Sequence, residues 1–296
     1  MKVVFYGNYA IKQVRSIYEA AGWRCDEYRA TGGNPLAKLG ELIKLISADC
    51  VYIVSGCDVQ STRAYRLALK LRKKVIVHWI GTDVLRIRED YYRNPRKING
   101  ECVNLSGAEW IGDELREIGI ESETIPTVPE YLDFSCPPMP KEHAVLTYIP
   151  SHRADFYGMD LVRRLAAALP EIRFYIVAND GEKDADKLPN MIYKGWVDSE
   201  KMRTLMSEST VLFRYPKHDS LSRMVMEALA AGRRVVYKYH YPYAITPASD
   251  KYEDILAALK SVLDEEPSVD HEASEYIKTE LSREKTLARY KKLGLI

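Results

Sequence analysis

Long apolar runs, an excess of one charge and paired cysteines are all missing from this sequence. No apolar run approaches the ~20 residues that a membrane-spanning helix needs. Lysine and arginine number 43 and aspartate and glutamate 42, so the net charge creates no general attraction to nucleic acid or to membranes. The five cysteines include no Cys-x-x-Cys spacing, which disfavours a zinc site or a disulfide framework. These absences predict a reduced, cytoplasmic protein with buried thiols that binds no nucleic acid.

The glycine fingerprint of dinucleotide-binding enzymes is missing as well. Lys2–Tyr6 is a short apolar run that predicts a first strand, because it is too short for the apolar segment of a secretion signal. Gly7 alone follows this strand, whereas the fingerprint needs three glycines in one turn. An NAD-dependent dehydrogenase is therefore disfavoured.

The stretch from Thr210 to Tyr239 predicts a strand, a loop, a helix and a second strand. Val211–Tyr215 is an apolar run that ends at Pro216, as expected of a buried strand. The loop offers helix-capping oxygens from Asp219, Ser220 or Ser222. Apolar residues then follow helical spacing until Gly232, namely Leu221, Met224, Val225, Ala228 and Leu229. Such a loop lies at the carboxyl edge of a parallel sheet, where ligands bind and where helix amides favour an anion such as phosphate.

Predicted strands and helices alternate along the whole chain, which indicates an α/β protein with helices on both faces of parallel sheets. One helix is predicted from the spacing of Leu36, Leu39, Leu42, Ile43 and Ile46. Five of the 14 prolines lie between Pro126 and Pro140, and this density breaks regular structure. We therefore expect a first domain at 1–125, a linker at 126–140, a second domain at 141–275 and a terminal helical segment at 276–296.

Two carboxylates stand eight positions apart, Asp219 before the predicted helix and Glu227 within it. Residues 219–232 (DSLSRMVMEALAAG) resemble the donor-binding signature of retaining glycosyltransferases with the GT-B fold, in the large family that includes bacterial mannosyl- and glucosyltransferases. That signature has glutamate at both acidic positions. Gly195-Trp196-Val197 resembles a second family segment, and the order of segments between 140 and 293 is that of the family's donor domain. The resemblance implies two Rossmann-like parallel-sheet domains facing across a cleft, with a last helix that crosses back to the first domain.

The resemblance also implies roles for individual residues. Glu227 would hold the ribose hydroxyls of a nucleotide, and Asp219 would contact the hydroxyls of the donor sugar. The amides of Ser222 and Arg223 would approach the sugar or the diphosphate, and Trp196 would lie beside the base. The other donor-binding candidates are Gly7, Asn8, Gly195, Val197, Ser220 and Leu221. On spacing alone, an amphipathic helix with a solvated Glu227 is the favoured interpretation, and the order of the surrounding segments reverses this preference.

The fourth predicted strand ends at His78, and Gly81 and Asp83 follow it. The segment resembles the family's His-Gly-x-Asp segment, with two extra residues between His78 and Gly81. A histidine there would orient the sugar or carry a proton, since its pKa lies near neutrality, and Asp83 would act as a base. A structural histidine is the alternative.

The loop after the first strand of the second half departs from the family. The family has an arginine and, five residues later, a lysine before a glycine, which together neutralise the donor diphosphate. Counted back from Gly158, Tyr157 stands at the lysine position and His152 at the arginine position. Arg153 would supply the charge after a shift of one residue, and Lys217 or Arg223 would supply a second charge.

These features favour a hexosyl-type glycosyltransferase that moves a sugar from a nucleotide sugar, such as a UDP- or GDP-sugar, with retention. The resemblance implies no metal or other cofactor, and a sugar, polysaccharide or glycolipid as acceptor. A non-catalytic nucleotide-sugar-binding protein, favoured by the missing lysine, and a sugar-nucleotide epimerase are the alternatives. Basic and aromatic residues between Arg86 and Lys97 suggest peripheral contact with the inner membrane face, or else a solvated helix.

Overall fold

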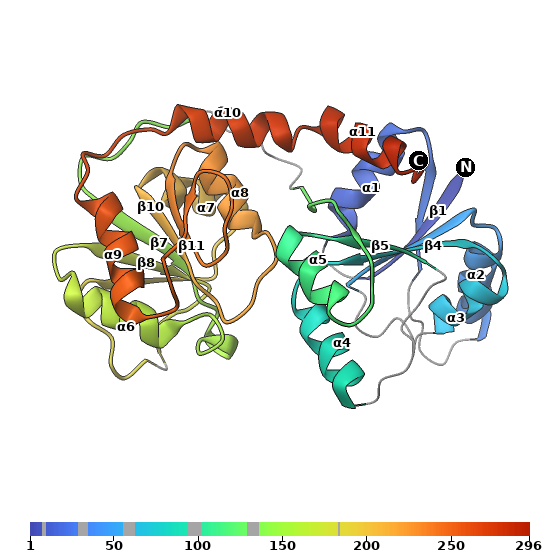
Figure 1. Cartoon of the computed structure of the whole chain (residues 1–296), viewed down its shortest axis with the longest axis horizontal. Helices are drawn as coiled ribbons and strands as arrows, with labels where there is room; N and C mark the ends of the chain where they lie inside the picture. The colour runs from blue at the N-terminus through green and yellow to red at the C-terminus, as the bar shows by residue number, and fades with distance from the viewer. Residues whose placement is uncertain (8–9, 29–34, 56–62, 94–101, 129–135, 183) are drawn as a thin grey trace. The chain divides into compact units, whose positions relative to one another are not determined.

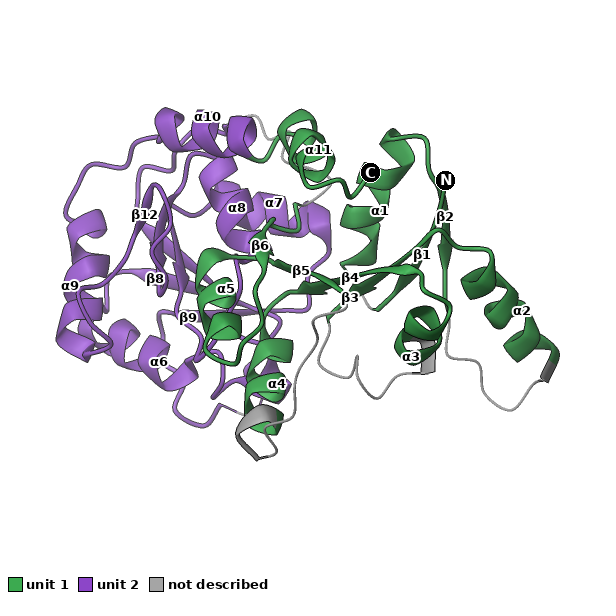
Figure 2. Ribbon diagram, turned by 45° about the vertical axis from the view of Figure 1, so that its right-hand side comes forward, with its two compact units in different colours: residues 1–130, 281–296 green, residues 131–280 purple. Residues whose placement is uncertain are grey.

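The chain forms two compact units, each built on a parallel sheet with flanking helices (Figure 1). The computed structural model describes residues 1–7, 10–28, 35–55, 63–93, 102–128, 136–182 and 184–296. Unit 1 comprises Met1–Glu130 together with Leu281–Ile296, and unit 2 comprises Tyr131–Glu280 (Figure 2). The last residues of the chain thus belong to the same unit as the first.

The sheet of unit 1 has the strand order β2-β1-β3-β4-β5-β6, and its neighbouring strands are parallel. Its strands are β1 (Lys2–Tyr6), β2 (Arg24–Glu27), β3 (Cys50–Val54), β4 (Lys74–Trp79), β5 (Val103–Ser106) and β6 (Glu123–Thr124). Its helices are α1 (Ile11–Ala20), α2 (Pro35–Ile46), α3 (Arg63–Lys70), α4 (Thr82–Arg93), α5 (Glu109–Arg116) and α11 (Arg283–Lys292).

The sheet of unit 2 has the order β12-β11-β10-β7-β8-β9 and is again parallel. Its strands are β7 (Ala144–Tyr148), β8 (Arg173–Val177), β9 (Met191–Gly195), β10 (Val211–Arg214), β11 (Arg234–Tyr237) and β12 (Ala244–Ile245). Its helices are α6 (Met159–Ala168), α7 (Ser199–Ser207), α8 (Arg223–Ala230), α9 (Tyr252–Leu263) and α10 (His271–Glu280), and a 3₁₀ turn, η2, spans Ser151–Arg153. The predicted strand-loop-helix-strand unit is present as β10, α8 and β11.

The central strands of both sheets are buried because they are almost continuously apolar, as expected where helices cover both faces of a parallel sheet. All five residues of β3 are buried, and so are the first four of β7. Helix α8 ends at Gly232, whose φ of +66° favours glycine. Thus the alternation of patterns in the sequence correctly predicted the layers of each unit.

The segment after α10 is anchored in unit 1 through Tyr290 of α11. Tyr290 is 1% exposed, and its hydroxyl lies 2.8 Å from the hydroxyl of Tyr52 in β3. The hydroxyl of Tyr18 in α1 donates to the carbonyl of Leu295. Aromatic rings of α1, β3 and α11 pack edge-on against one another at this point. The C-terminal segment is therefore part of the core of unit 1.

Arg233 binds the part of the proline-rich stretch around Pro137 and Pro138 to the rest of unit 2. This side chain is 1% exposed, and its guanidinium donates to the carbonyls of Pro137 and Pro138 and to those of Met206 and Ser207. Four carbonyls satisfy the buried donors without a carboxylate, and burial lowers the pKa of Arg233.

Among the described residues, none of the helices combines the length and the apolar character that a membrane span requires.

Candidate functional site

The loops that follow β7, β8, β9, β10 and β11 lie at the carboxyl edge of the unit 2 sheet, since all of these strands are parallel. Backbone hydrogen bonds join neighbouring loops. Ser151 donates to Ala178, Ala178 donates to Gly195, and Lys217 donates to Phe156. Gly158 has φ +83°, and the carbonyl of Tyr215 lies where a side chain would begin. The edge is thus a connected surface built by segments far apart in the sequence (Figure 1).

An ion pair between Arg214 and Asp219 lies at the centre of this edge. Arg214, the last residue of β10, is 6% exposed, and its Nε and Nη2 atoms lie 2.8 Å from Oδ2 of Asp219. Burial raises the pKa of the Asp219 carboxyl, and Arg214 limits the rise. The Asp219 side chain is still 18% exposed. Asp219 therefore remains within reach of a ligand, but it already has a cationic partner.

The ring of Tyr157 lies next to two guanidinium groups. Its centroid is 5.0 Å from Cζ of Arg214 and 5.8 Å from Cζ of Arg153. Arg153 also lies 4.1 Å from the ring centroid of Phe156. These distances are those of cation–π contacts. Two positive charges therefore converge at the position where the resembling family has its lysine.

The loop before α8 is held by two tyrosines. The Tyr237 hydroxyl donates to the carbonyl of Ser220 at 2.6 Å, and the amide of Asp219 donates to the Tyr239 hydroxyl at 3.2 Å. Ser222 is the N-cap residue of α8, but its side chain makes no capping hydrogen bond. The expected capping by a side-chain oxygen is therefore wrong for Ser222. The first amides of any helix have no partner within the helix, so the N-terminus of α8 favours an anion.

Glu227 lies one turn into α8 and is mostly buried. Its Oε1 accepts from Nε of Arg223 at 2.6 Å, and the Glu227 side chain is 10% exposed against 47% for Arg223. Burial raises the pKa of Glu227, whereas Arg223 and Arg203 oppose the rise. Since Arg223 is the more exposed member of this pair, a ligand with hydroxyl groups can displace it at Glu227. Leu221 beside it is buried and contributes packing.

Trp196 is the most exposed large apolar side chain of this edge, at 83%. It follows Gly195, the last residue of β9, which has φ +63° and pairs with Asn179 after β8. Val197 is half-buried and His152, in η2, is exposed. An exposed indole at the end of a strand offers a flat surface for stacking.

The two catalytic candidates of the first half lie inside unit 1. His78 is 0% exposed, its Nε2 lies 2.8 Å from the carbonyl of Ile125, and its Nδ1 lies 2.8 Å from the hydroxyl of Tyr52. Because a carbonyl only accepts, Nε2 carries the proton and Nδ1 accepts from Tyr52. Burial lowers the pKa of His78 to about 4. Asp83 is 3% exposed, and its carboxylate accepts from the amide of Ile80 at the start of α4.

Gly7 directly follows β1 in unit 1, with φ +147° and the carbonyl of Val54 directly beside it. Asn8 lies outside the described residues.

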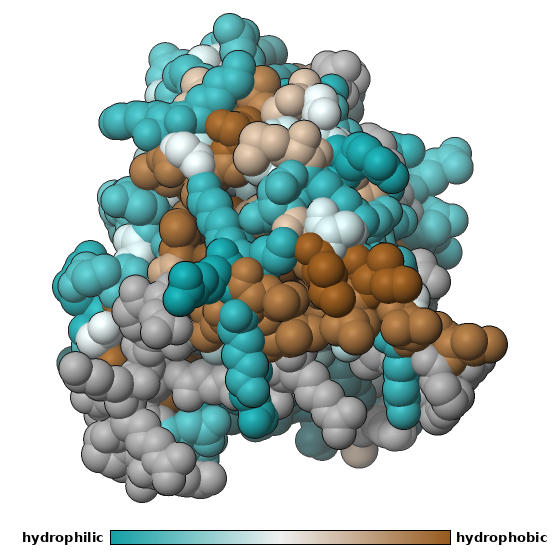
Figure 3. Space-filling view, turned by 90° about the vertical axis from the view of Figure 1, so that its right-hand side faces the viewer, coloured by the Kyte–Doolittle hydropathy of each residue, from teal (hydrophilic) through white to brown (hydrophobic). Residues whose placement is uncertain are grey.

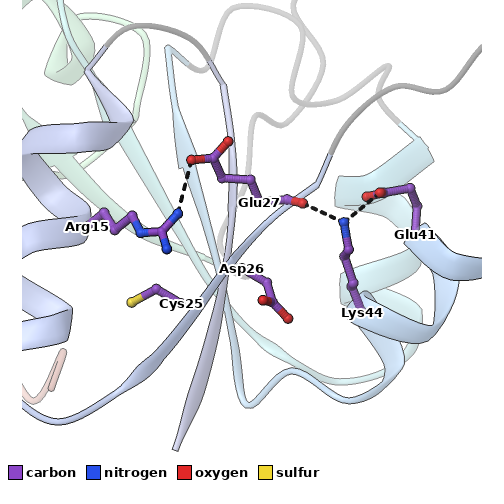
Figure 4. Close-up of a pocket in the computed structure, with 6 residues that line it drawn as sticks. All are labelled: Arg15, Cys25, Asp26, Glu27, Glu41 and Lys44. Atoms are coloured by element: carbon purple, nitrogen blue, oxygen red, sulfur yellow. Dashed lines mark hydrogen bonds and ion pairs between the residues drawn. The ribbon is translucent and has the colours of Figure 1, made fainter.

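A pocket of about 350 Å³ in unit 1 is lined by residues of α1, β2 and α2, namely Arg15, Cys25, Asp26, Glu27, Glu41 and Lys44 (Figure 4). Its charged side chains are paired, Arg15 with Glu27, Lys44 with Glu41, and Asp26 with Lys2 from outside the lining. This pocket presents no unbalanced charge to a ligand.

Within the described ranges, no group of three or more histidine, cysteine or acidic side chains is arranged to hold a metal ion. Asp184 and Asp186 are two acidic residues close together in the sequence, but Asp184 already has other partners. Asp184 pairs with Arg163 at 2.8 Å, accepts from the Tyr193 hydroxyl and accepts from the amide of Asp186. The absence of a metal from the reaction stays a prediction.

Arg214 was not predicted as a site residue from the sequence. One signal was present, because Arg214 is a charged residue within the otherwise apolar run Val211–Tyr215. An arginine in a buried strand needs a partner. Asp219, five residues later, was already a candidate and supplies it.

Comparison of the sequence with protein-family models and with curated proteins gave no match. Comparison of the structure with solved structures gave matches over the whole chain. Sucrose-phosphate synthase from Thermosynechococcus elongatus has a TM-score of 0.71 at 11% identity, over 99% of this chain and 98% of that protein. Anabaena HepE, solved in complex with UDP-glucose, has a TM-score of 0.69 at 11% identity, over the full length of both.

A third similar structure is TarM from S. aureus, solved with fondaparinux, alpha-GlcNAc-glycerol and UDP. Its TM-score is 0.59 at 13% identity, over 86% of this chain and 58% of that protein. Together with the two parallel sheets, these matches show that the chain has the GT-B fold of two Rossmann-like domains. The fold predicted from the sequence is confirmed.

Proposed function

We propose that the chain is a glycosyltransferase whose nucleotide-sugar donor binds at the carboxyl edge of the unit 2 sheet. The observation that carries the proposal is the convergence of Arg153 and Arg214 on Tyr157, with Arg214 paired to Asp219 in the loop that leads into α8. Two guanidinium groups and a helix N-terminus form a cationic environment suited to a diphosphate. Structures of the same fold that were solved with UDP-glucose and with UDP support the donor class.

Each part of the donor then has a group of matching chemistry. The Glu227 carboxylate accepts hydrogen bonds from the two ribose hydroxyls, and exposed Trp196 stacks against the base. The arginines stabilise the negative charge that develops on the departing diphosphate, so no metal is needed for that purpose. Asp219 and the backbone of Ser222 would contact the sugar. We propose a hexose as the transferred sugar, retention at its anomeric carbon, a sugar, polysaccharide or glycolipid as acceptor, and a cytoplasmic location.

His78 and Asp83 have no role in this proposal. Both are buried, and both make hydrogen bonds that unit 1 needs for its own packing. The reacting groups would come from the donor side, where the Asp219 side chain is 18% exposed.

A non-catalytic nucleotide-sugar-binding protein is the second candidate, and one observation favours it. Asp219 would have to accept sugar hydroxyls while Arg214 occupies Oδ2 through two nitrogen atoms. A carboxylate that is already neutralised holds the donor but adds little to the change in charge that catalysis requires.

Thermal unfolding with UDP, GDP, ADP and their sugar conjugates tests the binding step. A ligand at a hundred times its dissociation constant adds about 2.7 kcal/mol to the stability, which raises the unfolding temperature by a few degrees. We expect such a shift with one nucleotide and its conjugate. Absence of a shift with every nucleotide contradicts both candidate functions.

The substitution Glu227→Gln tests whether the nucleotide binds at Glu227 and not elsewhere on the surface. It keeps the volume of the side chain, and we expect it to weaken nucleotide binding about tenfold, because a hydrogen bond to a charged group contributes about 1.5 kcal/mol. Glu272→Gln, an exposed substitution in α10, is the matched control and should bind as the wild type does. Slow hydrolysis of the bound conjugate then distinguishes a transferase from a binding protein, which leaves the conjugate intact.

A further inference from the structure

Helix α2 turns its apolar residues outward. Leu39 is 52% exposed, Ile43 56% and Ile46 50%, and Leu36 at the start of the helix is exposed as well. At 100° per residue these four positions fall on one side of the helix, opposite Leu45, which is 1% exposed. Figure 3 shows hydrophobic side chains gathered in a band on this face of the molecule. We call Leu36, Leu39, Ile43 and Ile46 the α2 stripe.

The stripe is unusual for this chain. The other exposed large apolar residues among the described positions are Met1, Leu71, Trp196 and Tyr243. Leu71 directly follows α3, which packs beside α2 (Figure 1). Contiguous exposed aliphatic side chains on one helix mark an interaction surface, whereas isolated ones are ordinary.

The surroundings of the stripe are basic. Between residues 63 and 74 the sequence has six lysines and arginines and no acidic residue. Lys70 and Arg72 are exposed, and Lys73 reaches across to donate to the carbonyl of Ile46 at the end of α2. The acidic residues closest in sequence to the stripe have partners, since Glu41 pairs with Lys44 and Asp49 accepts from the amide of Lys2.

We infer that the α2 stripe and the basic segment at residues 63–74 dock on an anionic lipid surface. Aliphatic side chains on one helix face enter the boundary between headgroups and acyl chains, and neighbouring lysines and arginines attract anionic headgroups. A second copy of the chain is a poorer partner, because a symmetric contact would bring the same basic segments together. The sequence pattern predicted membrane contact at 86–97, a segment that lies partly outside the described residues. The inference places the contact at α2 and α3 instead.

Flotation of the full-length protein with lipid vesicles tests this inference. The probes are vesicles of phosphatidylcholine alone and vesicles that also contain phosphatidylglycerol, at low and at high salt. We expect binding to the anionic vesicles, weakened by salt because exposed charges are screened. No binding to anionic vesicles at low salt would overturn the inference.

Two double variants locate the surface. Leu39→Gln with Ile43→Gln, and Lys70→Glu with Arg72→Glu, should each lower the partition coefficient about tenfold or more. Lys260→Glu, an exposed charge reversal in α9 of unit 2, should bind nearly as the wild type does. All positions changed are exposed, so the unfolding temperature serves as a check that the fold is retained. Equal binding by the glutamine variant contradicts the inference, and so does a wild-type dimer in solution that this variant abolishes.

Discussion

Both units hold buried polar side chains beside a parallel sheet, but these side chains are neutral in unit 1 and charged in unit 2. In unit 1, His78, Tyr52 and Tyr290 form a neutral chain of hydrogen bonds that ends on a carbonyl. In unit 2, Arg214 and Asp219 form a charged pair that reaches the surface. The neutral chain is complete without a ligand. The charged pair is partly exposed, and it lies among further cationic groups, so unit 2 is where we expect ligand chemistry.

The largest effect is expected from breaking the charged pair. Arg214→Met removes the partner of Asp219 and leaves a mostly buried carboxylate, which should lower the free energy of unfolding of unit 2 by about 3 kcal/mol. Urea unfolding followed by circular dichroism measures it. Arg173→Met is the matched control, since Arg173 pairs with Glu142 on the surface and such pairs contribute about 0.5 kcal/mol. Equal losses in the two variants would show that the Arg214–Asp219 pair has no special weight.

The neutral chain in unit 1 should make stability depend on pH. The pKa of His78 is about 4 in the folded protein and about 6.5 when unfolded, so the unfolded chain binds more protons between these values. Stability from this group is therefore present above pH 6.5 and is lost as the pH falls towards 4. Between pH 7 and pH 5 the loss is about 2 kcal/mol.

His78→Gln removes this titration while leaving the other histidines in place. The difference between the unfolding free energies of wild type and variant should shrink, or reverse, as the pH is lowered from 7 to 5. A difference that is constant over that range would mean that His78 is not held neutral by burial.

The smallest effects come from the tyrosines of the same chain. Tyr52→Phe removes the donor to His78 Nδ1 and the acceptor for Tyr290, which should lower the free energy of unfolding by about 2 kcal/mol. Tyr290→Phe removes one hydrogen bond and leaves Tyr52 still donating, so about 1 kcal/mol is expected. Both are measured by urea unfolding. If Tyr290→Phe has the larger effect, the assigned direction of the hydrogen bonds is wrong.

The sequence predicted the layers of both units because strand and helix periods are local properties. The β10–α8–β11 unit was predicted from the apolar run at Val211, the helical spacing after Leu221 and the glycine at 232. Side-chain partners were harder to predict. Arg214 meets Asp219 only because the loop after β10 turns back over the strand. The loop is held by hydrogen bonds to Tyr237, the last residue of β11, and to Tyr239 just after it.

Burial was the second quantity that the pattern did not determine. The period of α2 correctly predicted a helix, but it did not reveal that Leu39 and Ile43 are exposed while Leu45 is buried. His78 likewise stands near the end of a strand, where ligand-binding residues are common. Its side chain is nevertheless fully buried and bonded to Tyr52, whose hydroxyl also meets Tyr290 of α11, a segment more than two hundred residues away in sequence. Contacts of this kind follow from the tertiary structure alone.

Hydrogen exchange of backbone amides tests the central claim most directly, namely that the donor binds at the carboxyl edge of unit 2. The protein is compared with and without UDP-, GDP- and ADP-sugars by mass spectrometry. With one of these donors we expect slower exchange in 151–158 and 219–227, because ligand contacts protect the amides of η2, the loop after it and the start of α8. If exchange in both segments is unchanged with every donor, or if protection is confined to unit 1, the proposed site is wrong.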